Sequence, residues 1–124
     1  MSAWTADELA RIGRADELRL ASRRPDGSLR PFVTMWVVRS GDDIFVRSAH
    51  GHSNPWFQRA LASGTGRIRA GGVERDVAFE EPGSGVDADL HAAYHAKYDR
   101  YGSSMVGTVV SPEAAQSTLR LVPR

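Results

Sequence analysis

The segment that most constrains the fold of this chain spans residues 29–39 and reads LRPFVTMWVVR. In an extended strand, alternate side chains point to opposite faces. Apolar side chains fall on both faces, which carry Phe32, Trp36 and Val38 on one side and Val33, Met35 and Val37 on the other. Such a strand lies inside a structure, with a core on one side and a helix or a second subunit on the other. We therefore expect residues 29–39 to form the most buried strand of the chain.

Two neighbouring segments predict strands that pair with this one. Residues 17–23 alternate apolar and polar side chains, and the turn sequence Pro25-Asp-Gly27 leads from them into residues 29–39. A second turn at residues 40–42 leads into residues 44–47, which are rich in strand-forming residues. The three strands are expected to form an antiparallel meander.

The second half of the chain predicts a hairpin and a closing strand. Residues 67–70 and 73–80 flank a Gly-Gly turn, and their charged faces can pair Arg67 and Arg69 with acidic residues opposite. Residues 118–122 form a last strand, whereas residues 105–110 are either a short strand or an irregular apolar segment. The pattern as a whole predicts a single α+β domain over residues 1–124.

Helices are predicted at both ends of this strand pattern. Thr5 and Glu8 form a capping box before a short helix that ends near Gly13. Residues 86–101 form the longest helix, in which Leu90, Tyr94, Tyr98 and Tyr101 share one face. Large aromatic side chains dominate packing energies, so this face is expected to pack against the sheet.

Composition excludes several classes of protein. The 124 residues carry a formal net charge of +1 and no cysteine, so neither a nucleic-acid partner nor a disulfide or thiolate metal site is indicated. No apolar run is long enough to span a membrane, and no signal peptide is recognisable, so we expect a cytoplasmic protein. His91 and His95 are one helical turn apart but lack further ligands nearby in sequence, and no metal site is expected.

Residues 43–63 predict a strand, a polar loop and a helix that begins at Asn54-Pro55. The free N–H groups at a helix start favour an anion, and Arg47 and Ser48 would be delivered to that point. His50 and His52 are then loop donors toward an anionic ligand. The same pattern also fits an ordinary connection with a solvated arginine.

No arrangement of nucleophile, base and acid is recognisable in the sequence, so catalytic residues stay unassigned. If the protein catalyses a reaction, a cofactor would supply the reactivity and the chain would bind and orient it.

The order of these elements resembles the flavin-binding split-barrel superfamily. The resemblance rests on residues 42–47, Ser48-Ala49, the helix start Asn54-Pro55-Trp56-Phe57 and the hairpin strands of residues 67–77, and it covers roughly residues 17–80. The deazaflavin-dependent nitroreductase branch is the closer match, and pyridoxamine-phosphate-oxidase-like proteins are more distant. The resemblance implies a six-stranded antiparallel split β-barrel with flanking helices. It also implies a homodimer that holds FMN or an 8-hydroxy-5-deazaflavin coenzyme in a cleft at the dimer interface.

The resemblance also implies site residues and two alternative functions. Phosphate contacts would come from Arg47, Ser48, Ala49 and His50, and the ring would lie against Thr34, Met35, Trp36 and Trp56. Tyr98 or Tyr101 would close the substrate side, and the basic residues that many relatives carry before the long strand appear here as Arg23, Arg24 and Arg30. The first function is an oxidoreductase that passes a hydride to a small organic acceptor. The second is a non-catalytic dimeric protein that binds an anionic metabolite or serves as a scaffold.

Overall fold

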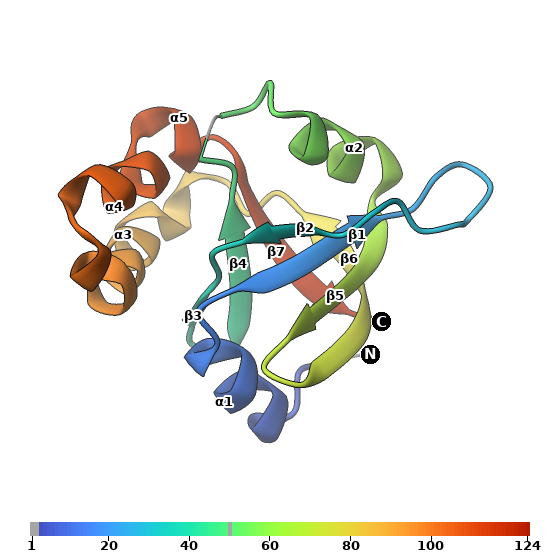
Figure 1. Ribbon diagram of the computed structural model, residues 1–124, viewed down its shortest axis with the longest axis horizontal. Coiled ribbons are helices and arrows are strands. Elements are labelled where there is room, and N and C mark those ends of the chain that lie inside the picture. Colours follow the sequence, from blue (N-terminus) through green and yellow to red (C-terminus); the bar gives the residue numbers. More distant parts are fainter. Residues whose placement is uncertain (1–2, 50) are drawn as a thin grey trace.

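Short strands and short helices make up the chain, with strands in succession after the first helix and helices in succession before the last strand (Figure 1). The computed structural model describes residues 3–49 and 51–124. Over these residues the strands are β1 (Leu18–Ser22), β2 (Val33–Met35), β3 (Val38–Ser40), β4 (Asp43–Arg47), β5 (Thr65–Ala70), β6 (Val73–Glu80) and β7 (Thr118–Pro123). The α-helices are α1 (Ala6–Arg14), α2 (Pro55–Ser63), α3 (Asp87–Tyr98), α4 (Ser103–Val110) and α5 (Pro112–Ala115), with 3-10 turns η1 (Ser84–Val86) and η2 (Asp99–Tyr101).

The seven strands form one antiparallel sheet in the order β2-β1-β5-β6-β7-β4-β3. The edge strands β2 and β3 are separated in sequence by Trp36 and Val37 alone. Three Cα–Cα steps from Met35 to Val38 span at most about 11 Å, whereas seven strands laid flat would measure about 29 Å across. The sheet must therefore curl until its edges approach each other. The result is the α+β split barrel expected from the sequence, with seven strands in place of six.

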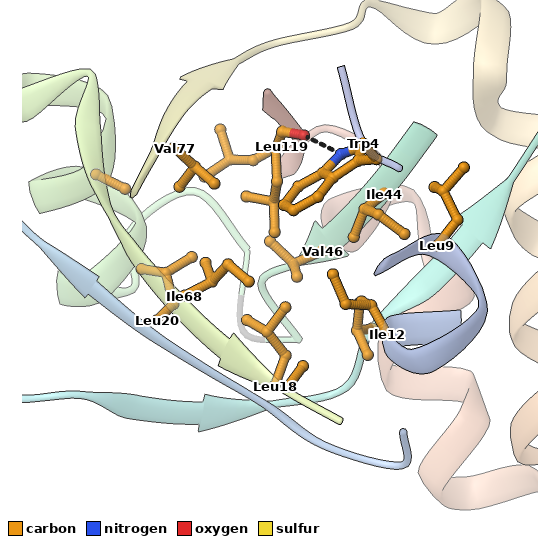
Figure 2. Packing of buried hydrophobic residues seen from close by; sticks show 14 of the residues in the cluster. Trp4, Leu9, Ile12, Leu18, Leu20, Ile44, Val46, Ile68, Val77 and Leu119 are labelled. Carbon is orange, nitrogen blue, oxygen red and sulfur yellow. Dashed lines mark hydrogen bonds between the residues drawn. The ribbon is translucent and has the colours of Figure 1, made fainter. Parts of the chain in front are cut away.

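The barrel interior is the main hydrophobic core (Figure 2). Leu18, Leu20, Ile44, Val46 and Ile68 are all buried in it. Helix α1 covers one end of this core, and the capping box predicted between Thr5 and Glu8 is confirmed. The helix ends at Arg14, one residue later than expected.

A second core lies between the sheet and the helices α3 and α4, which stand together on one side of the barrel (Figure 1). Leu90, Tyr94 and Tyr98 of the predicted aromatic face are fully buried in or beside it, which confirms their packing role. Residues 105–110 lie in helix α4, so the expectation of a strand or irregular segment was wrong. The helix is favoured because Val106 and Val109, three positions apart, then face this second core together.

The prediction of one long buried strand over residues 29–39 was wrong. The segment breaks into β2 and β3, which pair with different neighbours, and Val33 and Thr34 are exposed. The break is stabilised by helix α3: the Val37 N–H donates to the Tyr98 hydroxyl at 3.0 Å, and the Val37 carbonyl accepts from Lys97 Nζ at 2.7 Å. Both backbone groups are thus satisfied outside the sheet, as buried peptide groups require. The pairings of β1 with β2 and of β3 with β4 are as expected, but the continuous meander is not.

The predicted hairpin across Gly71-Gly72 is confirmed. Its register places Arg67 opposite Asp76 and Arg69 opposite Glu74. Both expected ion pairs form, with 2.9 Å between Arg67 Nε and Asp76 Oδ1. These side chains are largely solvated, so each pair contributes about 0.2–1 kcal/mol at most.

Lys97 makes the stability of the fold dependent on pH. Burial lowers the pKa of Lys97 from 10.5 to about 8, although Asp16 opposes and Arg100 supports this shift. Between pH 8 and 10 the unfolded chain holds more protons than the folded chain, so the free energy of unfolding must rise with pH. We expect a rise of about 1–3 kcal/mol, since one pKa unit corresponds to about 1.4 kcal/mol and partial exposure reduces the effect.

Urea unfolding at pH 8 and pH 10 measures this rise. The measurement stops at pH 10, because tyrosine side chains begin to ionise near that pH and would add their own effect on stability. The Lys97→Met variant should show no rise over this interval. Parallel pH profiles for the two proteins would contradict the assignment to Lys97.

Candidate functional site

One hollow of about 380 Å³ brings together most of the residues singled out in the sequence. We call it the ring cleft, and its walls include six of the eight expected cofactor-binding residues: Thr34, Met35, Trp36, Arg47, Ala49 and Trp56. Its volume lies within the range of small-molecule sites, which are mostly apolar with a few polar groups.

Four parts of the chain form the walls of the ring cleft, including the end of β4 and the loop after it, which supply Arg47 and Ala49. Strand β2 and the break that follows it supply Thr34, Met35 and Trp36, while helix α2 supplies Trp56. The Trp36 ring stacks on Tyr98, with 4.1 Å between ring centroids and 5° between their planes. This stacking fixes the orientation of Trp36, because aromatic pairs add to the energy of simple burial.

Helix α4 forms a wall that sequence reasoning missed. Met105, Thr108 and Val109 all line the ring cleft, and Met105 is 53% exposed. The sequence did contain a pattern that indicates this wall. In a helix, the spacing of Val106 and Val109 places both on one apolar stripe, and Met105 and Thr108 then lie on the adjoining face.

Arg47 lies at the base of the ring cleft and is buried, with 3% of its surface exposed. Its Nε donates to Thr118 Oγ1 at 2.9 Å, its Nη1 to the Val109 carbonyl at 2.9 Å, and its Nη2 to Asp87 Oδ1 at 3.2 Å. Burial lowers the pKa of Arg47, an effect that Asp87 opposes. The guanidinium thus joins β4 to β7, α3 and α4, and each of its three nitrogens already has a protein partner.

The loop after β4 is held by its own hydrogen bonds. Ser48 is buried and its hydroxyl donates to the Gly51 carbonyl at 2.7 Å, so Ser48 does not line the ring cleft. The predicted cap at Asn54 is confirmed, since its side chain accepts from the Trp56 N–H. His52 is exposed and contacts Gln58, whereas His50 lies outside the described residues.

The two tyrosines expected on the substrate side lie elsewhere. Tyr98 is fully buried, its hydroxyl within hydrogen-bond distance of Val37 and of the Asp16 carbonyl, and it does not line the ring cleft. Tyr101 is 44% exposed and donates to Asp16 Oδ2 at 3.0 Å. Neither tyrosine lines the ring cleft, so the expectation that one of them closes it was wrong: Tyr98 is packed into the second core and Tyr101, in η2, is held by Asp16. Both rings instead lie behind Trp36, with ring centroids 4.1 and 5.6 Å from it.

A second and larger hollow, of about 730 Å³, carries a concentration of positive charge. We call it the arginine cleft, and it is lined by Arg23, Arg24, Arg30 and Arg59 and by no acidic residue. Arg23 pairs with Asp76, and Arg24 donates to the Leu29 carbonyl. Arg30 Nε is buried without a hydrogen-bond partner within the described residues. A buried unpaired donor costs free energy, which makes this cleft suited to an anion.

A third hollow borders both clefts. This narrow hollow of about 100 Å³ shares Val33 and Trp56 with the ring cleft and shares Arg30 and Arg59 with the arginine cleft. An apolar slot flanked by tryptophans therefore lies close to a basic groove. This combination fits a ligand with a flat ring system at one end and a phosphate or carboxylate at the other.

Neither a metal site nor a membrane-spanning helix is found in the described part of the chain. Among residues 3–49 and 51–124, no group of three or more His, Asp or Glu side chains could hold a metal ion. His95 instead lies 2.8 Å from Asp99 on the exposed face of α3. Over the same residues, no helix has the length and apolar character needed to cross a membrane.

The curled antiparallel sheet and the flanking helices define a class of fold, the split barrel, that this chain shares with an F420 reductase at 14% identity and with a putative pyridoxamine 5'-phosphate oxidase from Listeria innocua at 13% identity. Within this class, residues 8–121 match the model of a family described as an uncharacterised protein conserved in bacteria, DUF2255, and the chain belongs to that family. No curated protein matches the sequence.

Solved structures similar to this chain share its fold at low sequence identity. An F420-H2-dependent reductase has a TM-score of 0.62 at 13% identity, over 86% of this chain and 93% of its own. The heme storage protein HutZ from Vibrio cholerae has a TM-score of 0.65 at 16% identity, over 95% of this chain and 87% of HutZ. A FAD-binding protein from Mesorhizobium loti has a TM-score of 0.54 at 14% identity, over 99% of this chain and 92% of its own. At these identities the likeness establishes the fold alone.

Proposed function

We propose that the protein is an oxidoreductase that binds FMN or an 8-hydroxy-5-deazaflavin coenzyme, with the ring in the ring cleft and the phosphate in the arginine cleft. The observation that supports this most is the closeness of the two clefts, because it places an apolar, tryptophan-lined slot near a basic groove in which Arg30 Nε is buried without a hydrogen-bond partner among the described residues. The fold similarity to an F420-H2-dependent reductase and a FAD-binding protein supports a cofactor of this type.

The chain's own residues would hold and orient the ring. Trp56 and Trp36 supply flat apolar surface, and Trp36 is kept in place by its stacking on Tyr98. Thr34 supplies a hydroxyl at the cleft wall, where a polar ring edge needs a partner. When bound, a reduced flavin or deazaflavin supplies the hydride that the side chains lack.

The phosphate would be held by Arg30 and Arg59. Neither has a carboxylate within ion-pair distance in the described part of the chain, and both line the arginine cleft and the narrow hollow beside it. Arginine binds phosphate through two parallel N–H groups, which adds both energy and direction. Arg47, expected at first to contact the phosphate along with Ser48, Ala49 and His50, would act instead by holding the wall of the ring cleft together.

We further propose that the protein works as a homodimer. Val33 and Met105 are 36% and 53% exposed, and both line the ring cleft. Large apolar side chains at the mouth of a binding cleft are typical of surfaces that a partner covers. A second copy of the chain placed there would exclude water from the ring.

Titration of the purified protein with FMN and with the deazaflavin coenzyme, followed by fluorescence, tests the proposal. We expect micromolar binding of one of them, about −8 kcal/mol. Replacing Arg30 and Arg59 by Gln should weaken binding by about 1.5–3 kcal/mol for each charged hydrogen bond lost. Arg11→Gln, on α1 and outside both clefts, is the matched control and should bind as the wild type does.

Three results would redirect this proposal. Binding of neither cofactor would reject it. Unchanged affinity in the Arg30 and Arg59 variants would reject the phosphate assignment alone. Binding without reduction of quinone or nitroaromatic acceptors would favour the non-catalytic alternative. Light scattering on the same samples gives the mass of the assembly with and without cofactor.

A further inference from the structure

A separate surface cavity of about 480 Å³, largely open to solvent, lies between helix α1, strand β3 and helix α3. It shares no lining residue with the ring cleft or the arginine cleft. Its volume is within the range of sites that bind small molecules. The proposed flavin function leaves it without a role.

The walls of this cavity combine apolar surface with positive charge. Leu9, Val38 and Ala96 supply apolar surface, Arg14 and Arg39 supply two cations, and Lys97 supplies an amine. No acidic residue lines it. Arg39 Nε donates to the Gly41 carbonyl at 2.8 Å, and no ion pair engages Arg14 or Arg39 in the described part of the chain. A ligand with an apolar body and one anionic group therefore matches the cavity.

Lys97 adds a reactive group to this wall, and it is the only lysine of the chain. Its Nζ lies 2.7 Å from the Val37 carbonyl and 5.2 Å from the centroid of the Tyr98 ring. Burial lowers its pKa to about 8, so a large share of the amine is neutral in mildly alkaline solution. A neutral amine can keep one N–H on Val37 while its lone pair is free to attack a carbonyl carbon.

We propose that this cavity is a second ligand site, which takes an aldehyde or ketone with an apolar body and an anionic group and forms a reversible imine with Lys97. The lone pair of Nζ adds to the carbonyl carbon to give a carbinolamine. The carbonyl oxygen then leaves as water with the two amine protons as the C=N bond forms. The step needs no oxidant or reductant, and water reverses it.

Trapping the imine with cyanoborohydride tests the proposal, because reduction leaves a permanent mass increase on the amine that reacted. The probes are para-carboxybenzaldehyde and benzaldehyde, which differ in the carboxylate alone. Free α-amino groups ordinarily have a pKa near 8, so the N-terminal amine of the purified protein serves as an internal standard for unassisted reactivity. Peptide mapping separates the two labelled positions.

With para-carboxybenzaldehyde, we expect Lys97 to be labelled at least about tenfold faster than the α-amino group, which corresponds to about 1.4 kcal/mol of binding in the cavity. Benzaldehyde should show little of this advantage. Replacing Arg14 and Arg39 by Gln should remove the preference for the carboxylated probe while Lys97 stays reactive. Lys97→Arg keeps a donor to the Val37 carbonyl and should be labelled at the α-amino group alone.

Equal labelling of the two amines by the carboxylated probe would overturn the proposal. The same holds if Lys97 reacts equally fast with both aldehydes, or if the Arg14 and Arg39 variant keeps the full preference. Binding of flavin is not needed for any of these measurements, so failure of the oxidoreductase proposal would leave their interpretation unchanged.

Discussion

Arg47→Met is expected to lower the free energy of unfolding by about 3–5 kcal/mol, the cost of removing one partner from a buried charged network. Its guanidinium supplies the hydrogen bonds to the Val109 carbonyl, Thr118 Oγ1 and Asp87 described above. Methionine fills a similar volume but donates to none of them. Helices α3 and α4 would lose their common anchor to β4, and the ring cleft would lose its base.

Urea unfolding at neutral pH measures this loss. Arg11→Met is the matched control, because Arg11 forms an exposed ion pair with Asp7 one helical turn away, with half of the Arg11 side chain exposed. Pairs of that kind contribute about 0.3–0.5 kcal/mol. A loss below about 1 kcal/mol in Arg47→Met would mean that the network is not coupled to folding.

Gly66→Ala is expected to cost about 2–4 kcal/mol, near the upper end of the overpacking range. Gly66 lies within β5, opposite Ser22 of β1. A Cβ at this position would lie 2.2 Å from the Ala21 carbonyl oxygen and 2.8 Å from Phe79 Cζ. The Ala21 carbonyl belongs to the backbone and cannot move aside as a flexible side chain can. Strands β1 and β5 would therefore have to move apart to make room for the new Cβ.

Gly107→Ala is expected to raise the free energy of unfolding, in contrast to Gly66→Ala, when both are measured by urea unfolding. Gly107 lies in helix α4, and a Cβ there has nothing within 4 Å. Alanine in an exposed helix interior stabilises by about 0.5–1 kcal/mol relative to glycine. If both variants change stability by the same amount, the close approach of β1 and β5 at Gly66 does not limit packing.

Local chemistry in the sequence predicted much of the fold. The capping box at Thr5, the Asn54-Pro55 helix start and the Gly71-Gly72 hairpin depend on residues within a few positions of one another. Each is present in the structure. The alternation in residues 17–23 and 118–122 likewise places β1 and β7 correctly.

The errors all involve contacts between distant segments. The apolar side chains on both faces of residues 29–39 do not indicate that the strand breaks. The break depends on Tyr98 and Lys97, about 60 positions later in the sequence. Arg47 at the end of a strand is as consistent with solvent as with burial until Asp87 and Val109 are placed beside it. The apolar run of residues 105–110 is a helix because the second core lies beside it.

Of the two clefts of the candidate site, the sequence predicted residues of the ring cleft but not the arginine cleft. Residues 34–36, Ala49 and Trp56 were named from a family resemblance and now line a single cleft. The arginine cleft was not foreseen as a site, although Arg23, Arg24 and Arg30 stood out as a basic group. Arg59 joins them from α2, a helix whose orientation depends on the closure of the barrel.

The two-residue link between the sheet edges also fixes an order of events during folding. The placement of β2 relative to β3 depends on Tyr98 reaching the Val37 N–H, a contact across 61 positions of sequence. Contacts of such long range form slowly, because closing the intervening loop costs entropy before the contact repays it. Strand β7 is later still, and until it pairs with β4 and β6 each of those strands keeps an unpaired edge, where a growing chain can pair with the wrong partner.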